Sequence, residues 1–190
     1  EDPSKWGQTI NGVLVEGNLK SVTVDGVHIA IGVPDVRKRV AEQVDALGIP
    51  SISVIHPSAV VVASAKVSAG TFVGPLALIN SKAQVGPHAL INSGAIIEHD
   101  AHIGAFATVC PGARIGALAS LHEGAFVGTG AIVGSHIEVG SYSAVGMGAV
   151  VTKAVDPQVV AYGVAAKNVR SIRDSKDWKQ ILSGEKLELV

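Results

Sequence analysis

The chain has 190 residues, of which 47% are hydrophobic but only 4% aromatic, and 22 are glycine. Its net charge of −1 gives no electrostatic reason to expect nucleic acid or an anionic membrane as a partner. No stretch of about twenty apolar residues is free of glycine, proline or charge, so no membrane-spanning helix is predicted. The single cysteine, Cys110, excludes an internal disulfide, and without a recognisable signal peptide we expect the cytoplasm.

Residues 1–50 predict a small α/β unit. Two short strands bounded by glycine, at 12–17 and 27–32, are followed by a helix over 34–48 that begins with Pro-Asp and ends at glycine. This helix places Val36, Val40, Val44 and Leu47 on one face. A further strand at 52–55 leads into the next region, and the order strand, helix, strand favours parallel pairing. A nucleotide-binding α/β unit usually starts with a glycine-rich strand-to-helix turn, which is missing. We therefore expect a partial nucleotide-sugar-binding unit whose glycine-rich part lies upstream.

Residues 51–153 carry a period of six. Every sixth residue from Ile55 to Val151 is aliphatic, and the residue two before it is small almost every time. This period fits neither a helix nor a half-buried strand, but it fits a chain that makes a short strand, turns and repeats. Three sides of six residues make one coil, so we predict a parallel β-helix of about five coils with both columns pointing inward. The residue after the aliphatic one is often glycine, where we expect a corner with positive φ.

Residues 154–190 leave the repeat. A helix is predicted over 174–182, because Trp178, Ile181 and Leu182 have helical spacing. We expect this short C-terminal helix to cover the open end of the β-helix, since an uncovered end would invite edge-to-edge association.

The repeat resembles the left-handed parallel β-helix of the hexapeptide-repeat acyltransferases. Four segments, Ala30-Ile31-Gly32, 55–59 (IHPSA), 91–95 (INSGA) and 96–100 (IIEHD), are similar to the sialic-acid O-acetyltransferase-related branch, which includes bacterial nucleotide-amino-sugar N-acetyltransferases. The resemblance implies a mostly β fold, acetyl-CoA as co-substrate and a nucleotide-linked amino sugar as acceptor, in surface-glycan biosynthesis. It also implies a homotrimer that binds the coenzyme in a groove between two subunits.

The resemblance assigns the catalytic roles to His99 as general base and to Asp100 as the acid beside it. An imidazole suits this role because it accepts and releases a proton near neutral pH, and a neighbouring carboxylate favours its protonated form. The amine is expected to attack the thioester directly, without an acyl-enzyme. Stacking by eighteen places Lys82 beside Asp100, where it would compete for the carboxylate. The amide of Asn92 either points toward the substrate or satisfies a turn.

Coenzyme contacts are expected along the β-helix and near its end. Family members carry a second histidine nine residues after the first, where this chain has Thr108. They also carry a Gly-x-Pro-Ala-Lys segment, matched by 163–167 with Ala165 in place of proline and Lys167 kept. The glycines are equally well explained by corner geometry. The candidates are Thr108, Gly116, Ala117, Gly128, Ala144, Gly146 and Lys167.

Other functions are weighed against this one. The same base would serve O-acetylation of sialic acid or a related sugar hydroxyl. A non-catalytic β-solenoid scaffold or binding module would favour regular outward rows of Thr or Asn, but the outward positions here are mixed. A zinc-dependent carbonic anhydrase of related fold needs three converging histidines, two of them five residues apart. No histidine pair has that spacing, so no metal is predicted, and Cys110 has no adjacent histidine to make it a nucleophile.

Overall fold

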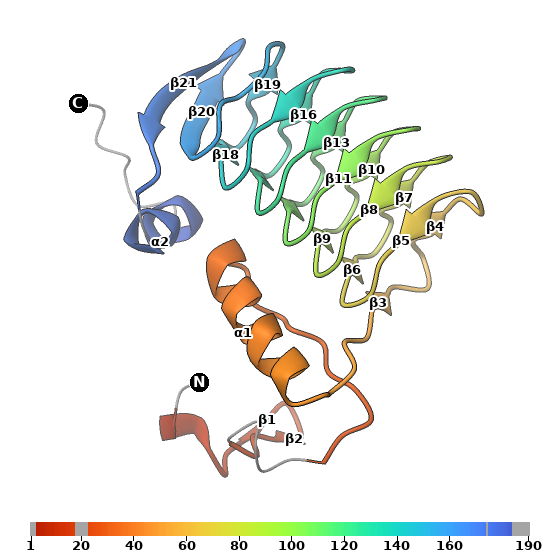
Figure 1. Cartoon of the computed structure of the whole chain (residues 1–190), viewed down its shortest axis with the longest axis vertical. Coiled ribbons are helices and arrows are strands. Elements are labelled where there is room, and N and C mark those ends of the chain that lie inside the picture. Colours follow the sequence, from red (N-terminus) through yellow and green to blue (C-terminus); the bar gives the residue numbers. More distant parts are fainter. Residues whose placement is uncertain (1–2, 18–22, 174, 184–190) are drawn as a thin grey trace.

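The computed structural model of the chain describes residues 3–17, 23–173 and 175–183. A β-helix forms most of the molecule, an N-terminal region carries one long helix, and a strand hairpin and a second helix follow the β-helix (Figure 1). No helix in these ranges is long and apolar enough to cross a membrane. The elements outside the β-helix are η1 (Pro3–Lys5), β1 (Thr9–Ile10), β2 (Val13–Leu14), α1 (Pro34–Ala46), β20 (Val159–Gly163), β21 (Ala166–Ser171) and α2 (Ser175–Ser183).

The β-helix has three parallel sheets, called X, Y and Z here, and the chain visits them in that order. Sheet X contains β3 (Val54–Ile55), β6 (Phe72–Val73), β9 (Leu90–Ile91), β12 (Thr108–Val109), β15 (Phe126–Val127) and β18 (Ala144–Val145). Sheet Y contains β4 (Val60–Val61), β7 (Leu78–Ile79), β10 (Ile96–Ile97), β13 (Arg114–Ile115), β16 (Ile132–Val133) and β19 (Val150–Val151). Sheet Z contains β5 (Lys66–Val67), β8 (Gln84–Val85), β11 (His102–Ile103), β14 (Ser120–Leu121) and β17 (Glu138–Val139).

The inward columns of the β-helix are the aliphatic and small residues predicted from the sequence. Ile97 pairs with Ile79 on one side and Ile115 on the other, so equivalent residues stack every eighteen positions. Ile97 and Ala95 are completely buried, as are most of their equivalents. Strands β3 to β17 make five complete coils, and β18 and β19 begin a sixth. The predicted parallel β-helix is confirmed. Its narrow interior explains the shortage of aromatic residues, because three small columns and three aliphatic ones already fill it.

The corners between the sheets, called XY, YZ and ZX, differ from the prediction in one respect. Positive φ occurs at the third residue after the aliphatic one, for example at Gly112 (67°) and Leu118 (59°), rather than at the first. The glycine at the first position is needed for a different reason. A Cβ at Gly104 would lie 2.7 Å from the backbone carbonyl carbon of His122 in the next coil. Close approach of successive coils, not a left-handed conformation, therefore selects glycine there.

The N-terminal region packs on corner ZX through α1. This helix begins at Pro34 and ends two residues before the predicted Gly48. Its buried face is Pro34, Arg37, Ala41 and Val44. The strands predicted at 12–17 and 27–32 are shorter than expected: β2 pairs antiparallel with β1, and Val27 makes a single parallel bridge to Ser51.

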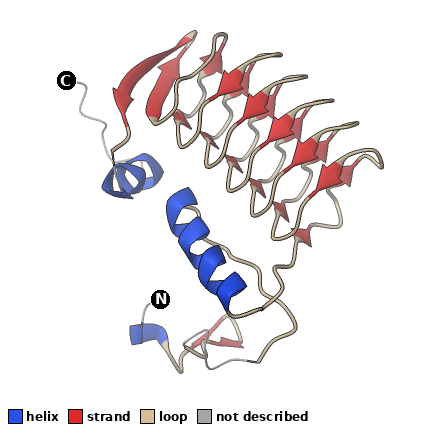
Figure 2. Ribbon diagram, in the orientation of Figure 1, coloured by secondary structure: helices blue, strands red, loops and turns tan. Residues whose placement is uncertain are grey.

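The C-terminal region covers the β-helix differently from the prediction. Strands β20 and β21 form an antiparallel hairpin that continues sheet X beyond β18. Helix α2 packs on the outer face of sheet X instead of the open end, because Trp178 is buried against Phe126 with an edge-to-face ring contact of 6.0 Å. Figure 2 shows helices α1 and α2 on the same side of the β-helix.

Candidate active site

The pair His99 and Asp100 lies in the turn between β10 and β11, at corner YZ. Asp100 adopts a left-handed conformation (φ 56°), and its Oδ2 lies 3.0 Å from Nδ1 of His99. The two side chains are 41% and 49% exposed, so the imidazole is accessible to a substrate. In the described part of the chain Lys82 makes no ion pair with Asp100, and the competition expected from the sequence does not arise. The local geometry suits a carboxylate that orients an imidazole.

The turn that carries this pair is fixed by the coils before and after it. The amide of Asp100 donates to the carbonyl of Ser81 at 3.0 Å, and the carbonyl of His99 accepts from the amide of Leu118 at 3.1 Å. Glu98 accepts a hydrogen bond from Asn80 Nδ2 at 3.1 Å, which also links the coil of the pair to the coil before it. The backbone of the pair is therefore rigidly placed, while its side chains reach outward.

The predicted coenzyme residues divide into separate groups. Gly116 and Ala117 occupy corner YZ one coil beyond His99, where Ala117 leaves space beside the imidazole. Gly128 and Gly146 lie at corner XY, on the opposite edge of sheet Y. Both have a structural reason to be glycine, since a Cβ would lie 2.8 Å from the Met147 amide nitrogen or from the Tyr162 Cβ.

Asn92 also lies at corner XY, directly after β9. Its side-chain amide donates to the carbonyl of Val109 on β12 at 3.2 Å, so in this single chain the half-buried side chain links two successive coils. Lys167 is exposed on β21, which continues sheet X.

Thr108 and Ala144 lie on sheet X beneath the helices. Thr108 is only 3% exposed, and its hydroxyl accepts a hydrogen bond from Arg37 Nη2 at 3.0 Å. Ala144 is buried in the apolar cluster of Phe126 and Trp178. In this single chain neither side chain lies at a corner with the other candidates.

Arg37 is a residue that sequence analysis missed. It is completely buried, and burial lowers its pKa to about 10, which still leaves it charged at neutral pH. The predicted face of the helix was Val36, Val40, Val44 and Leu47, but the structure buries the face that contains Arg37. Pro34, Arg37, Ala41 and Val44 have helical spacing and could have indicated this buried face. The charged side chain of Arg37 made the face look solvent-exposed in the sequence.

Cys110 and the histidines bear on the alternative chemistries. Burial raises the pKa of the Cys110 thiol to about 12, so it stays protonated and is a poor nucleophile at neutral pH. Within the residues that the structure describes, no group of three or more His, Cys, Asp or Glu side chains is arranged to hold a metal ion.

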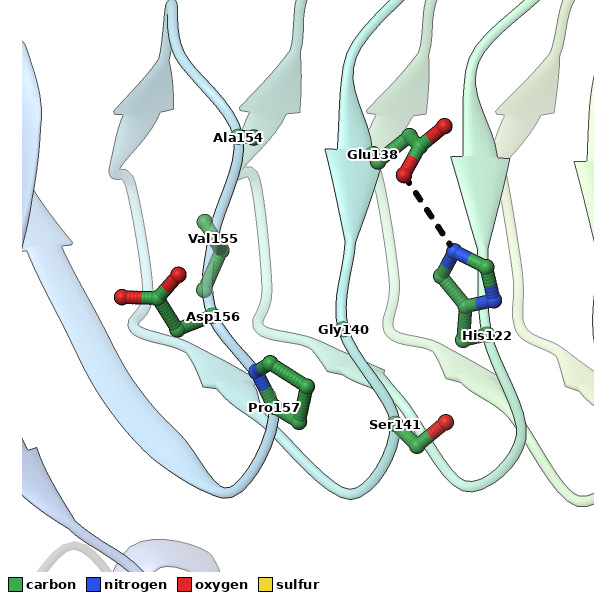
Figure 3. Close-up of a pocket in the computed structure, with 8 residues that line it drawn as sticks. All are labelled: His122, Glu138, Gly140, Ser141, Ala154, Val155, Asp156 and Pro157. Atoms are coloured by element: carbon green, nitrogen blue, oxygen red, sulfur yellow. Dashed lines mark ion pairs between the residues drawn. The ribbon is translucent and has the colours of Figure 1, made fainter.

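A surface pocket of about 260 Å³ lies elsewhere, along the edge of sheet Z toward corner ZX (Figure 3). In it His122 Nε2 lies 3.6 Å from Glu138 Oε2, and both side chains are largely exposed. None of the residues predicted from the sequence lines this pocket. His99 lies on the other edge of sheet Z, so the pocket is separate from the candidate site.

A three-sided β-helix built on six-residue repeats, with an accessible histidine–carboxylate pair at one corner, defines the class of hexapeptide-repeat transferases. Comparisons with protein-family models and with curated protein sequences find no match. Comparison with solved structures finds similar proteins.

PerB from Caulobacter crescentus, solved with CoA and GDP-perosamine, is 32% identical over 84% of this chain and 80% of its own, with a TM-score of 0.82. The acetyltransferase domain of PglB from Neisseria gonorrhoeae, solved with acetyl coenzyme A, is 28% identical over 88% of this chain and 83% of its own, with a TM-score of 0.84. WeeI from Acinetobacter baumannii is 28% identical over the same shares, with a TM-score of 0.83. The chain belongs to the family of hexapeptide-repeat acetyltransferases.

Proposed function

We propose that this protein transfers the acetyl group of acetyl-CoA to the amino group of a nucleotide-linked amino sugar. The observation that carries the proposal is the accessible pair His99–Asp100 at corner YZ of a hexapeptide β-helix. It is supported by the likeness to the Caulobacter enzyme, which is described as a GDP-perosamine N-acetyl transferase and binds CoA and GDP-perosamine. The resemblance to the sialic-acid O-acetyltransferase-related branch is the reason to propose a role in surface-glycan biosynthesis. The single cysteine is the reason to place the reaction in the cytoplasm.

The mechanism follows from what an amide-forming step requires. The neutral amine attacks the thioester carbonyl, a C–N bond forms, and the carbonyl oxygen becomes negatively charged. Nε2 of His99 takes the proton that the amine sheds, while Asp100 accepts from Nδ1–H and so holds the ring in the tautomer that can act as a base. The C–S bond then breaks, and His99 returns the proton to the departing thiolate of coenzyme A.

Acetyl-CoA is proposed to bind between subunits of a homotrimer. The candidates at corner YZ (His99, Gly116 and Ala117) and those at corner XY (Asn92, Gly128 and Gly146) are separated by the width of sheet Y in one chain. A single site can include both groups if corner YZ of one subunit faces corner XY of the next.

The outward residues of sheet Y support this arrangement. They are mainly apolar, and several are exposed in the single chain, as Val60 (56%) and Ile132 (40%) are. The corresponding row of sheet Z is polar, and that of sheet X is largely covered by α1 and α2. Sheet Y is therefore the face that would gain most from burial between subunits. In such an assembly Lys167 at the end of sheet X would serve the phosphates of the coenzyme.

The test is release of free thiol from acetyl-CoA, with and without GDP-perosamine or a UDP-linked 4-amino sugar. We expect release that depends on the sugar, and a fall of about 10²- to 10⁴-fold in His99→Ala, the usual contribution of a general base. His102→Ala is the matched control, because His102 is exposed on the neighbouring strand β11. Sugar-dependent release that survives His99→Ala would remove the histidine from its role, and an acetylated product cleaved by mild alkali would identify O-acetylation instead.

A further inference from the structure

The Arg37 side chain joins α1 to two successive coils of the β-helix. Its Nε donates to the carbonyl of His88 at 2.9 Å, and Nη2 donates to the carbonyl of Phe106 and to the hydroxyl of Thr108 at 3.0 Å. A longer contact of 3.4 Å reaches the carbonyl of Ala107. The planar guanidinium thus donates hydrogen bonds to carbonyl groups of both coils at the same time. Its rigid geometry fixes the position of α1 relative to both coils, which a single flexible contact would not do.

The same side chain holds the loop that precedes α1. Nη1 donates to the carbonyl of Ile31 at 2.6 Å and to that of Gly32 at 3.1 Å. This loop follows the segment in which Val27 makes its parallel bridge to Ser51. The loop leads from this bridge to the first turn of α1, within the unit that the resemblance predicts to hold the nucleotide-linked sugar.

The strands that Arg37 contacts lead to the candidate site. β9 begins two residues after His88 and ends directly before Asn92, and β12 begins with Thr108. At their far ends the two strands are joined again, because Asn92 donates to the carbonyl of Val109. The guanidinium therefore contacts the chain at the beginning of β9 and β12, and the substrate-binding candidate Asn92 lies at the end of β9.

Attachment of α1 does not by itself require a buried charge. Ala41 and Val44 are buried together with Ile29, and Phe106 packs against this cluster. Lys38 Nζ adds an ion pair to Glu123 at 2.7 Å. Apolar contacts hold a helix without fixing its register, since they are not directional, whereas burying a guanidinium costs desolvation free energy. What the Arg37 network adds is one defined position of α1 along corner ZX.

We propose that Arg37 is a positioning residue, which fixes the N-terminal unit on the β-helix so that the nucleotide-linked sugar reaches the acetyl-transfer site in one orientation. This inference rests on the proposed function. It requires that loss of the network affects the acceptor and not the acetyl donor, because the donor candidates at corners YZ and XY and Lys167 on β21 all lie outside the N-terminal unit.

The test compares Arg37→Met and Arg37→Lys with Arg39→Met, the same change at an exposed arginine of the same helix. For Arg37→Met we expect the KM for GDP-perosamine or the UDP-linked 4-amino sugar to rise about tenfold or more, with the KM for acetyl-CoA unchanged. Arg37→Lys, which keeps the charge but loses the fork, should lie between, and Arg39→Met should match the wild type. Hydrogen exchange should show α1 less protected in Arg37→Met while β9 to β16 keep their protection.

Two kinetic outcomes overturn the proposal: an unchanged acceptor KM in Arg37→Met, or a parallel rise in both KM values, which indicates general destabilisation. Absence of transfer by the wild-type protein with either sugar counts against the proposed function instead. In that event unchanged exchange of α1 in Arg37→Met still overturns the inference about Arg37.

Discussion

His88 is a buried histidine between α1 and the β-helix. Its ring stacks parallel to that of Phe106 with centroids 5.1 Å apart, and its Nδ1 has no hydrogen-bond partner among the described residues. Burial lowers the pKa of His88 below its ordinary value of 6.5; the carboxylate of Asp45 opposes this, and the charges of Arg37 and His28 reinforce it. The folded protein therefore keeps this imidazole neutral where the unfolded chain would protonate it.

This gives the stability of the protein a pH dependence. The contribution of neutral His88 is fully present above pH 6.5 and is lost as the pH falls below it, because the unfolded state then binds the extra proton. His88→Asn keeps a side chain that tolerates the positive φ of 56° at this position. We expect the free energy of unfolding to fall more for the wild type than for His88→Asn between about pH 8 and pH 5.5, measured by urea denaturation. Equal losses in the two proteins would show that His88 does not carry the effect.

At the residue scale, the corner glycines allow two costs of replacing glycine by alanine to be compared: the strain of a positive φ and a steric clash with the next coil. Gly112→Ala places a Cβ in open space but at a φ of 67°, which we expect to cost about 1 to 2 kcal/mol. Gly104→Ala has no such φ, but its Cβ meets backbone atoms of the next coil at 2.7 to 2.9 Å. Backbone cannot rotate away as a side chain can, so we expect this change to be costlier, about 3 kcal/mol or more. Denaturant unfolding of the two variants measures the order, and the reverse order would contradict the close-approach argument.

At the scale of elements, α2 packs on sheet X chiefly through Trp178, with an ion pair of 2.8 Å between Asp177 and Arg170 beside it. Trp178 is buried against Phe126, and α2 contributes no strand to the β-helix. We expect Trp178→Ala to release α2, with hydrogen exchange rising over 175–183 while β9 to β16 stay protected, because the helix loses the large buried side chain that packs it on sheet X. Trp6→Ala is the control, since Trp6 is 42% exposed. Faster exchange along the β-helix in Trp178→Ala would mean that α2 supports the whole fold.

The elements also show which structure the sequence predicts. The strands of the β-helix follow from the six-residue period because every residue in a column meets the same neighbours, one coil above and one below. The exposed place of His99 and Asp100 at a corner was predictable for a similar reason, because it follows from the phase of the repeat, whereas their catalytic role rests on the family resemblance and stays a prediction. The buried face of α1 was predicted only in part: Val44 is buried, but Leu47 is exposed and Arg37 is buried instead. Arg37 becomes a core residue only when carbonyls some fifty and seventy residues away converge on it. The burial of Thr108 and the packing of Trp178 likewise depend on docking that no local pattern records.

At the scale of the whole molecule, the outward row of sheet Y is the place to test assembly. Leu78 belongs to this row, between Val60 and Ile96 on the neighbouring strands. We expect Leu78→Glu to convert the proposed trimer to monomers, measured by light scattering after gel filtration, because a carboxylate buried between apolar faces loses its hydration. Gln84→Glu, which adds the same charge on sheet Z of the same coil, should leave the trimer intact. A wild-type protein that elutes as a monomer would contradict the proposed assembly directly.

The uninterrupted repeat restricts how the length of this protein can change. Removal of six residues between His88 and Phe106 would keep every later aliphatic residue inward but move each following strand to the adjacent sheet, so that Phe106 and Thr108 would no longer face Arg37 of α1. Only removal or addition of eighteen residues preserves both the interior and the surface, as the pairing of Ile97 with Ile79 and Ile115 shows. Each such step between His99 and the hairpin of Lys167 would shift the two relative to one another by one strand spacing, about 4.8 Å. The number of coils between them therefore sets the length of any ligand that contacts both, and this length can change only in whole steps of one coil.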